Sequence, residues 1–154
     1  MNDLFETTDG IQRNTERIKK NGEVFTPACL IQYLCKNVSD KDWADPTKTF
    51  LDPTCGNGQI LCYILEKRLE HGVSKKDAIS TLFGIELMED NVQICKQRLR
   101  EILQTNKFDD IINHNIVCSN IFYWNIAEWC PRKDKFIVKH KRANVNSSIN
   151  HKLF

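Results

Sequence analysis

The sequence lacks the features that would assign it to several special classes of protein. No apolar run reaches the roughly 18 residues that a membrane-spanning helix needs. The first ten residues are acidic, whereas a secretory signal peptide is basic and then apolar. No internal repeat or low-complexity tract is present. These absences predict a protein without a membrane segment, and we expect it in the cytoplasm.

The seven cysteines do not form a recognisable metal-binding motif. None belongs to a Cys-x-x-Cys pair, and their number is odd. They lie mostly within apolar stretches, as small buried side chains do in a reducing compartment. We therefore expect no metal site and interpret the cysteines as small hydrophobic residues. A reactive or ligand role is the alternative.

Length and composition predict a single globular domain. The chain has 154 residues, of which 41% are hydrophobic and 27% charged. Its net charge of +2 is uneven, because residues 131–154 hold seven basic side chains against one acidic, a local charge of +6. We expect a polar arm over residues 1–22, one domain over 23–138 and a basic tail over 139–154. The tail is either a solvated end or a binding segment for phosphate groups.

Hydrophobic periodicity predicts alternating helices and strands. Helices are expected over 27–38, 60–69, 74–81 and 88–102, and strands over 49–52 and 82–86. A third strand is expected from Ile111-Ile112 and residues 116–118, and a fourth over 136–138. Thr26 is the expected cap of the first helix and Pro27 its first residue. This order predicts an α/β protein with a parallel sheet and helices on both faces.

Candidate ligand-binding residues follow the predicted strands, because open parallel sheets bind ligands at the carboxyl ends of their strands. The first strand leads into Asp52-Pro53-Thr54-Cys55-Gly56-Asn57-Gly58, where two glycines let a ligand approach the backbone. A plain strand-to-helix turn is the alternative. Glu86 ends the second strand, where a carboxylate can accept both hydroxyls of a ribose or, alternatively, stabilise the next helix. Leu61 stands where a nicotinamide-binding motif has its third glycine, which disfavours that cofactor.

Four motifs together resemble the N-terminal half of adenine-N6-specific DNA methyltransferases. They are Phe25-Thr26-Pro27, Asp52-Pro53-x-x-Gly56-x-Gly58, Gly84-Ile85-Glu86-Leu87 and Cys118-Ser119-Asn120, and the similarity covers roughly residues 22–125. In that family the cofactor motifs precede the catalytic motif. The resemblance implies a partial Rossmann-like methyltransferase fold over 23–138, S-adenosylmethionine as cofactor and DNA as partner.

The resemblance also implies a role for each matching residue. Thr26 and the backbone behind Pro27 would hold the methionine carboxylate, since a helix start attracts anions. Asp52 and the backbone of the turn, including Thr54, Gly56 and Gly58, would line the methionine end of the cofactor. Glu86 would hold the ribose hydroxyls. The adenine would contact Leu87 and Met88, for which plain packing is the alternative, and its amino group would donate to Asn120.

The catalytic motif of that family, Asn/Asp/Ser-Pro-Pro-aromatic, does not occur in the sequence. The prolines are single, at positions 27, 46, 53 and 131, and residues 136–138 are followed by Lys139-His140-Lys141-Arg142. Three hypotheses follow: an N-terminal part of a methyltransferase that is inactive alone; a cofactor-binding module that acts without transfer or with a second chain; and a nucleic-acid-binding or interaction protein on the same scaffold. A sheet that ends after a fourth strand further predicts self-association or a partner strand.

Overall fold

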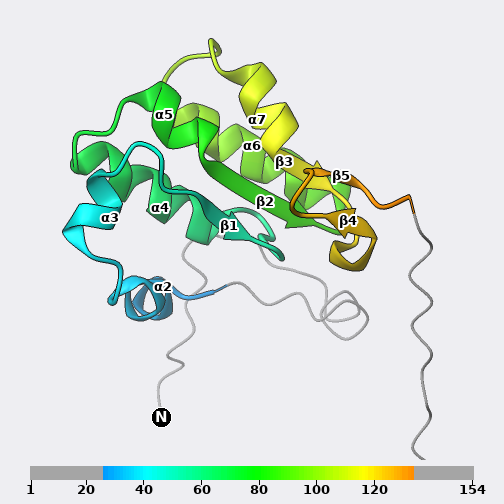
Figure 1. Ribbon diagram of the computed structural model, residues 1–154, viewed down its shortest axis with the longest axis horizontal. Helices are drawn as coiled ribbons and strands as arrows, with labels where there is room; N and C mark the ends of the chain where they lie inside the picture. The colour runs from blue at the N-terminus through cyan, green and yellow to red at the C-terminus, as the bar shows by residue number, and fades with distance from the viewer. Residues whose placement is uncertain (1–25, 134–154) are drawn as a thin grey trace, which may run out of the picture.

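The computed structural model describes residues 26–133 (Figure 1). Its central sheet contains three parallel strands, β1 (Phe50–Asp52), β2 (Leu82–Glu86) and β3 (Ile116–Cys118), in the order β1-β2-β3. The expected arm over 1–22, the fourth strand over 136–138, the tail over 139–154 and Phe25 lie outside the described residues. Within the described range, the expected α/β fold with a parallel sheet flanked by helices is confirmed.

Two long helices connect the strands. Helix α4 (Gln59–Glu70) joins β1 to β2, and α6 (Glu89–Leu103) joins β2 to the segment before β3. The apolar stripe of α6 comprises Val92, Cys95, Leu99 and Leu103, each at most 1% exposed. The acidic side chains of Glu89 and Asp90 occupy its first turn, which suits the helix dipole. Amphipathic pattern and charge placement therefore predicted this helix almost to the residue.

The core forms where α4 and α6 pack on the sheet. Its fully buried apolar side chains include Leu61, Leu65, Leu82, Leu99 and Ile116. Gly84 lies at the centre of β2, and a methyl group there would crowd Leu61 of α4 and Cys55 of the turn after β1. The missing side chain thus allows helix and strand to pack closely.

Shorter helices complete the described structure: α2 (Ala28–Cys35), α3 (Asp40–Ala44), α5 (Lys75–Ser80) and α7 (Asp109–Asn115). Two expectations need correction, and helix α3 was not expected from the sequence. Ile111-Ile112 belong to α7, because the preceding Asp109 and Asp110 start a helical turn that buries Ile112. Residues 40–44 are helical, since Ser39 accepts a hydrogen bond from the Asp42 N–H. Helix α2 begins at Ala28, so its cap is Pro27 and not Thr26.

A small hairpin follows β3 and was not expected from the sequence. After the 3-10 turn η1 (Ile121–Tyr123), β4 (Trp124–Asn125) pairs antiparallel with β5 (Cys130–Pro131). The Trp129 ring packs edge-on against Phe83 of β2 at 4.7 Å between centroids, and its indole N–H donates to the carbonyl of His114. In Figure 1 the hairpin lies to the right of the three strands. It fixes the segment after β3 against the sheet.

The entry to β1 is fixed by a buried arginine on α4. The Arg68 guanidinium donates to the carbonyls of Asp45 and Lys48 and to the hydroxyl of Thr81, and it stacks on the Phe50 ring. The hydrogen bonds compensate the burial of the charge. The start of β1 is therefore tied to both α4 and the start of β2. None of the helices between residues 26 and 133 is both long and apolar enough to span a bilayer.

Candidate functional site

The expected binding residues lie at the carboxyl ends of adjacent parallel strands. In the sheet, Asp52 of β1 is paired with Gly84, and Glu86 of β2 is paired with Cys118 of β3. The Cys55 N–H donates to the carbonyl of Ile85, so the turn after β1 folds over the end of β2. The strand order therefore brings the Asp52–Gly58 motif and the Gly84–Leu87 motif together.

The two glycines of this turn are required for different structural reasons. Both have positive φ, +53° at Gly56 and +85° at Gly58. A side chain at Gly58 would clash with the sulfur of Cys95 on α6, whereas one at Gly56 would meet no atom within 4 Å. Gly58 is thus required for packing of the turn on α6. Gly56 leaves open space beside the backbone, where a ligand can approach.

Glu86 joins the two loops at the end of the sheet. Its carboxylate accepts one hydrogen bond from the Gly56 N–H at 3.0 Å and another from the Met88 N–H at 2.9 Å. Each carboxylate oxygen accepts one bond and keeps further acceptor capacity. The carboxylate is therefore fixed in place while it can still accept hydrogen bonds from a ligand.

Asp52 is a buried carboxylate beside this arrangement. It is 9% exposed and accepts the N–H of Thr54 at 3.1 Å. Burial raises the pKa of Asp52, the Thr54 hydrogen bond opposes this rise, and the negative charge of Glu86 adds to it. A positively charged ligand group would relieve the unfavourable burial of the ionised carboxylate.

A small hollow of about 40 Å³ lies at the turn. Its lining contains four of the expected residues, and these are Thr26, Asp52, Thr54 and Gly56. Pro27 follows Thr26 as the cap of α2, and Gly58 packs the turn against Cys95 of α6. The hollow therefore collects residues from the segment before α2, the end of β1, the turn and the start of α4.

The remaining expected residues, Leu87 and Asn120, follow β2 and β3 and do not line the hollow. Leu87 is 59% exposed, so its side chain does not belong to the core. The side-chain oxygen of Asn120 accepts the Phe122 N–H at 3.0 Å and caps the turn η1. The backbone links the two loops, because the Ser119 N–H donates to the carbonyl of Glu86.

Comparison with known proteins identifies the family. The family model described as N-6 DNA methylase matches residues 1–122. The chain belongs to the N-6 DNA methylase family. No curated protein and no solved structure matches it. The resemblance on which the sequence analysis rested is thereby confirmed for the family and for its partial α/β fold.

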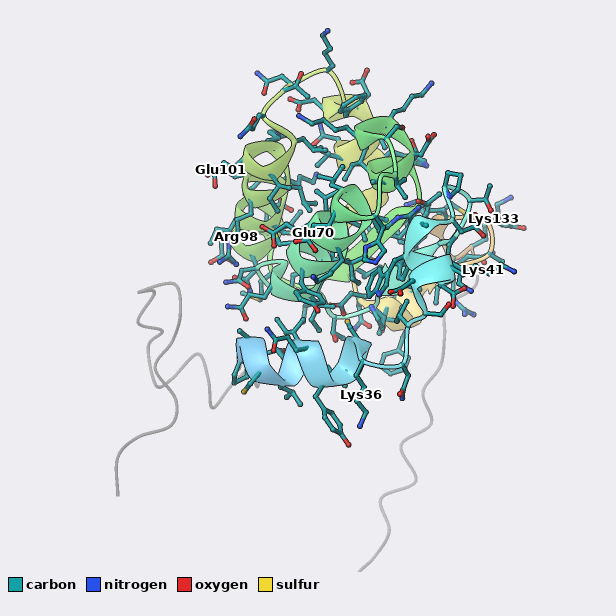
Figure 2. The ribbon with its side chains drawn as sticks, turned by 90° about the vertical axis from the view of Figure 1, so that its left-hand side faces the viewer. Lys36, Lys41, Glu70, Arg98, Glu101 and Lys133 are labelled. Atoms are coloured by element: carbon teal, nitrogen blue, oxygen red, sulfur yellow. The ribbon has the colours of Figure 1, made fainter. Side chains whose placement is uncertain are left out.

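In this member of the N-6 DNA methylase family, a larger cleft of about 450 Å³ lies between α2, α4 and α6. Its polar lining includes Gln32, Glu66, Arg98 and Glu101. Figure 2 shows Arg98 and Glu101 along α6, with α2 below the ends of the longer helices. The sequence analysis did not find this cleft, because it depends on where α2 lies relative to α4 and α6.

The sequence analysis also missed Gln59, the first residue of α4. It lines both the hollow and the larger cleft, and its side-chain oxygen is buried without a hydrogen-bond partner. Its position directly after Gly58, at the start of a helix beside the glycine turn, is the signal that marks it in the sequence. The chemistry of the site therefore includes one unused acceptor.

Near the turn, Cys55 is buried and Cys62 is half-buried. A hydrogen bond with Cys95 and burial raise the pKa of Cys55, and burial raises the pKa of Cys62 to about 12. Thiols in such surroundings react slowly, which favours the packing role over the reactive one. Among the described residues, no group of three or more histidines, cysteines or carboxylates is arranged to hold a metal ion.

Proposed function

We propose that this member of the N-6 DNA methylase family binds S-adenosylmethionine at the carboxyl ends of β1, β2 and β3. The observation that carries the proposal is the position of Glu86, whose carboxylate is held by the Gly56 and Met88 N–H groups. The arrangement places a rigid acceptor pair beside the open space at Gly56. Such a pair suits the two adjacent hydroxyls of a ribose.

The hollow at the turn suits the amino-acid end of the same ligand. At about 40 Å³ it is too small for a nucleoside, which needs a pocket of roughly 300 Å³ or more. It contains the buried carboxylate of Asp52, which favours a cationic group. The adenosine part would therefore lie outside the hollow, between Glu86 and the exposed Leu87, with Asn120 near its amino group.

The start of α2 provides for the ligand's carboxylate. The helix begins directly after Pro27, and its first backbone N–H groups precede the first intrahelical donors, the N–H groups of Leu30 and Ile31. Free N–H groups at a helix start attract anions. Thr26 lines the hollow beside them and adds a hydroxyl. An anion contact at the start of α2 together with a cation contact at Asp52 would fit a zwitterionic amino acid.

Methyl transfer to DNA requires residues beyond those that bind the cofactor. Extraction of an adenine from the duplex calls for acceptors for its amino group and an aromatic surface for its ring. The family's Pro-Pro-aromatic motif is not in the 154-residue sequence. We therefore propose that residues 23–138 form the cofactor-binding part, and that a further segment or a second chain supplies the transfer motif and the contacts to DNA.

Equilibrium dialysis of the full chain with labelled S-adenosylmethionine or S-adenosylhomocysteine tests the proposal. We expect micromolar to low-millimolar binding, and a loss of at least tenfold in Glu86→Ala, which removes both loop contacts and the ribose acceptors. Glu89→Gln is the matched control, because this exposed side chain lies on the neighbouring helix turn and contacts Gln93. No binding at millimolar ligand by folded wild-type protein would refute the proposal.

A second assay separates binding from transfer. Incubation of the chain alone with labelled S-adenosylmethionine and unmethylated DNA is expected to leave the DNA unlabelled. Transfer by the chain alone would show that its own residues replace the missing motif, and it would contradict the proposed division between the cofactor-binding part and the transfer motif.

A further inference from the structure

We propose that Gln59 is an additional ligand-binding residue, whose side-chain oxygen accepts a hydrogen bond from the primary ammonium group of the cofactor. This inference rests on the proposed function and names a contact within the same site. Gln59 is not part of the four motifs that carry the family resemblance.

The first observation is an unused acceptor. Three side-chain polar atoms of the described residues are buried without a hydrogen-bond partner, and they are Gln59 Oε1, Arg68 Nε and Trp124 Nε1. Gln59 Oε1 is the acceptor in this group, and its residue lines the hollow beside Asp52. A buried acceptor without a donor carries an uncompensated loss of hydration. A ligand that brings a donor would remove this loss.

The second observation is the charge of the hollow. Its lining contains the carboxylate of Asp52 and no lysine, arginine or histidine. The other side chains that line the hollow are uncharged at neutral pH. They include the Cys55 thiol, because its hydrogen bond with Cys95 and its burial raise its pKa. A hollow whose lining includes a buried carboxylate and an amide acceptor suits a cationic donor better than an anion.

The third observation is the size of the hollow. About 40 Å³ accommodates a small head group and excludes a purine or a sugar. A primary ammonium carries three donors, enough for Asp52 and Gln59 with one left for the backbone or water. A neutral hydroxyl has a single donor and would leave one of the two acceptors unused. The lining of the hollow therefore suits an ammonium better than a hydroxyl.

Three ligands separate the ammonium contact from the other contacts. S-adenosylhomocysteine carries the ammonium and the carboxylate, decarboxylated S-adenosylmethionine keeps only the ammonium, and 5′-methylthioadenosine lacks both. Affinities of the full chain for each ligand are measured by isothermal titration calorimetry, with Gln59→Leu and Gln59→Glu as the variants. Gln97→Leu is the matched control, since this exposed glutamine on α6 contacts Glu101 and does not line the hollow.

We expect Gln59→Leu to weaken the two ammonium-bearing ligands about tenfold, as for the loss of one hydrogen bond to a charged group, and to leave 5′-methylthioadenosine unchanged. Gln59→Glu should retain or strengthen binding of decarboxylated S-adenosylmethionine. The thermal midpoint of free Gln59→Leu should match or exceed that of the wild type, because the substitution removes a buried unpaired acceptor.

Other outcomes overturn the inference. Equal affinity of Gln59→Leu and wild type for S-adenosylhomocysteine shows that the amide makes no contact. An equal loss for 5′-methylthioadenosine assigns the residue a structural role only. Weaker binding of decarboxylated S-adenosylmethionine by Gln59→Glu would place another group at this oxygen. If the wild type binds none of the three ligands, the proposed function itself fails, and the inference fails with it.

Discussion

Helices α6 and α2 were predicted from the same kind of apolar pattern, yet they are packed very differently. In α6, Val92, Leu99 and Leu103 are at most 1% exposed. In α2, Ile31 is buried, whereas Leu30, Tyr33 and Leu34 are 44%, 61% and 57% exposed. In the chain, α6 lies between β2 and β3, and it packs against the sheet, whereas α2 precedes the sheet and lies at the lower left of Figure 1.

The difference shows what an apolar pattern can and cannot predict. Its period indicates a helix, because every third or fourth side chain falls on one face. Burial of that face depends on neighbouring elements. The crossover position of α6 between β2 and β3 guarantees a neighbour, and α2 precedes the sheet without such a guarantee. We infer that the packing of α6 contributes more to stability than the packing of α2.

The largest change in stability is expected when an apolar side chain is truncated on α6, and the same change on α2 provides the comparison. Leu99→Ala should lower the free energy of unfolding by about 3–5 kcal/mol, because it leaves a cavity among fully buried side chains. Leu34→Ala on α2 should change it by no more than about 0.5 kcal/mol. Urea unfolding followed by circular dichroism measures both. Similar losses for the two variants would contradict the assignment of stability to α6.

The second-largest loss of stability is expected at the glycine turn, which packs on α6 through Gly58. Gly58→Ala should lower the free energy of unfolding by about 2–3 kcal/mol, since it adds a clash with Cys95 to the strain of a positive φ. Gly56→Ala carries the strain alone and should lose about 1 kcal/mol. The same unfolding assay applies. A larger loss for Gly56→Ala would show that the turn is not held by its packing on α6.

A smaller change in stability is expected from Asp52, which is buried and lines the hollow. Because burial raises the pKa of Asp52, its protonated form stabilises the fold below the ordinary value near 3.9, and this contribution is lost as the pH rises through the raised value. Asp52→Asn should therefore be more stable than the wild type at pH 7, by less than the loss at Gly58, with the difference shrinking toward pH 3. Thermal unfolding at several pH values measures it.

The control for Asp52 is Glu66→Gln on α4, whose exposed carboxylate should give no such stabilisation at pH 7. The same Asp52→Asn protein should bind S-adenosylhomocysteine more weakly, because the cationic end of the ligand loses its counter-charge. A destabilised Asp52→Asn protein at pH 7 would mean that the carboxylate is compensated in the free protein.

The smallest effect on stability is expected at the open edge of the sheet. Among the described strands β1 has a single neighbour, β2, and its Leu51 is 36% exposed. An edge of this kind invites pairing with another chain, so we expect size-exclusion chromatography to show self-association. Leu51→Lys should shift the protein toward the monomer and change the free energy of unfolding by about 0.5 kcal/mol. A wild-type monomer at all concentrations would count against an open sheet.

Much of the fold could be predicted from the sequence, and the errors have physical causes. Helix α6 was placed within one residue at each end, because stripe, acidic first turn and length agree. Ile111-Ile112 were assigned to a strand, because a short apolar pair is compatible with both strand and helix patterns. The preceding Asp109 and Asp110 form the first turn of α7, so the pair is helical. Helix α3 was overlooked, although Ser39 followed by Asp42 is a capping signal.

The candidate site could be predicted in its residues more than in its contacts. The alternation of strands and helices sufficed to place Asp52 and Glu86 at neighbouring strand ends. The hydrogen bonds of Glu86 to Gly56 and Met88 depend on the turn geometry, and the buried oxygen of Gln59 depends on where α2 lies. Such distances between separate segments are not encoded in any local pattern.

The double attachment of Glu86 has a thermodynamic consequence for recognition. If the proposed nucleoside binds at Glu86, a side chain already held by two main-chain donors would lose little further rotational freedom. The entropy cost of ordering this side chain arises during folding, so ligand binding would include less of that cost. Affinity at this position should consequently respond more to the chemistry of the incoming sugar than to loop flexibility.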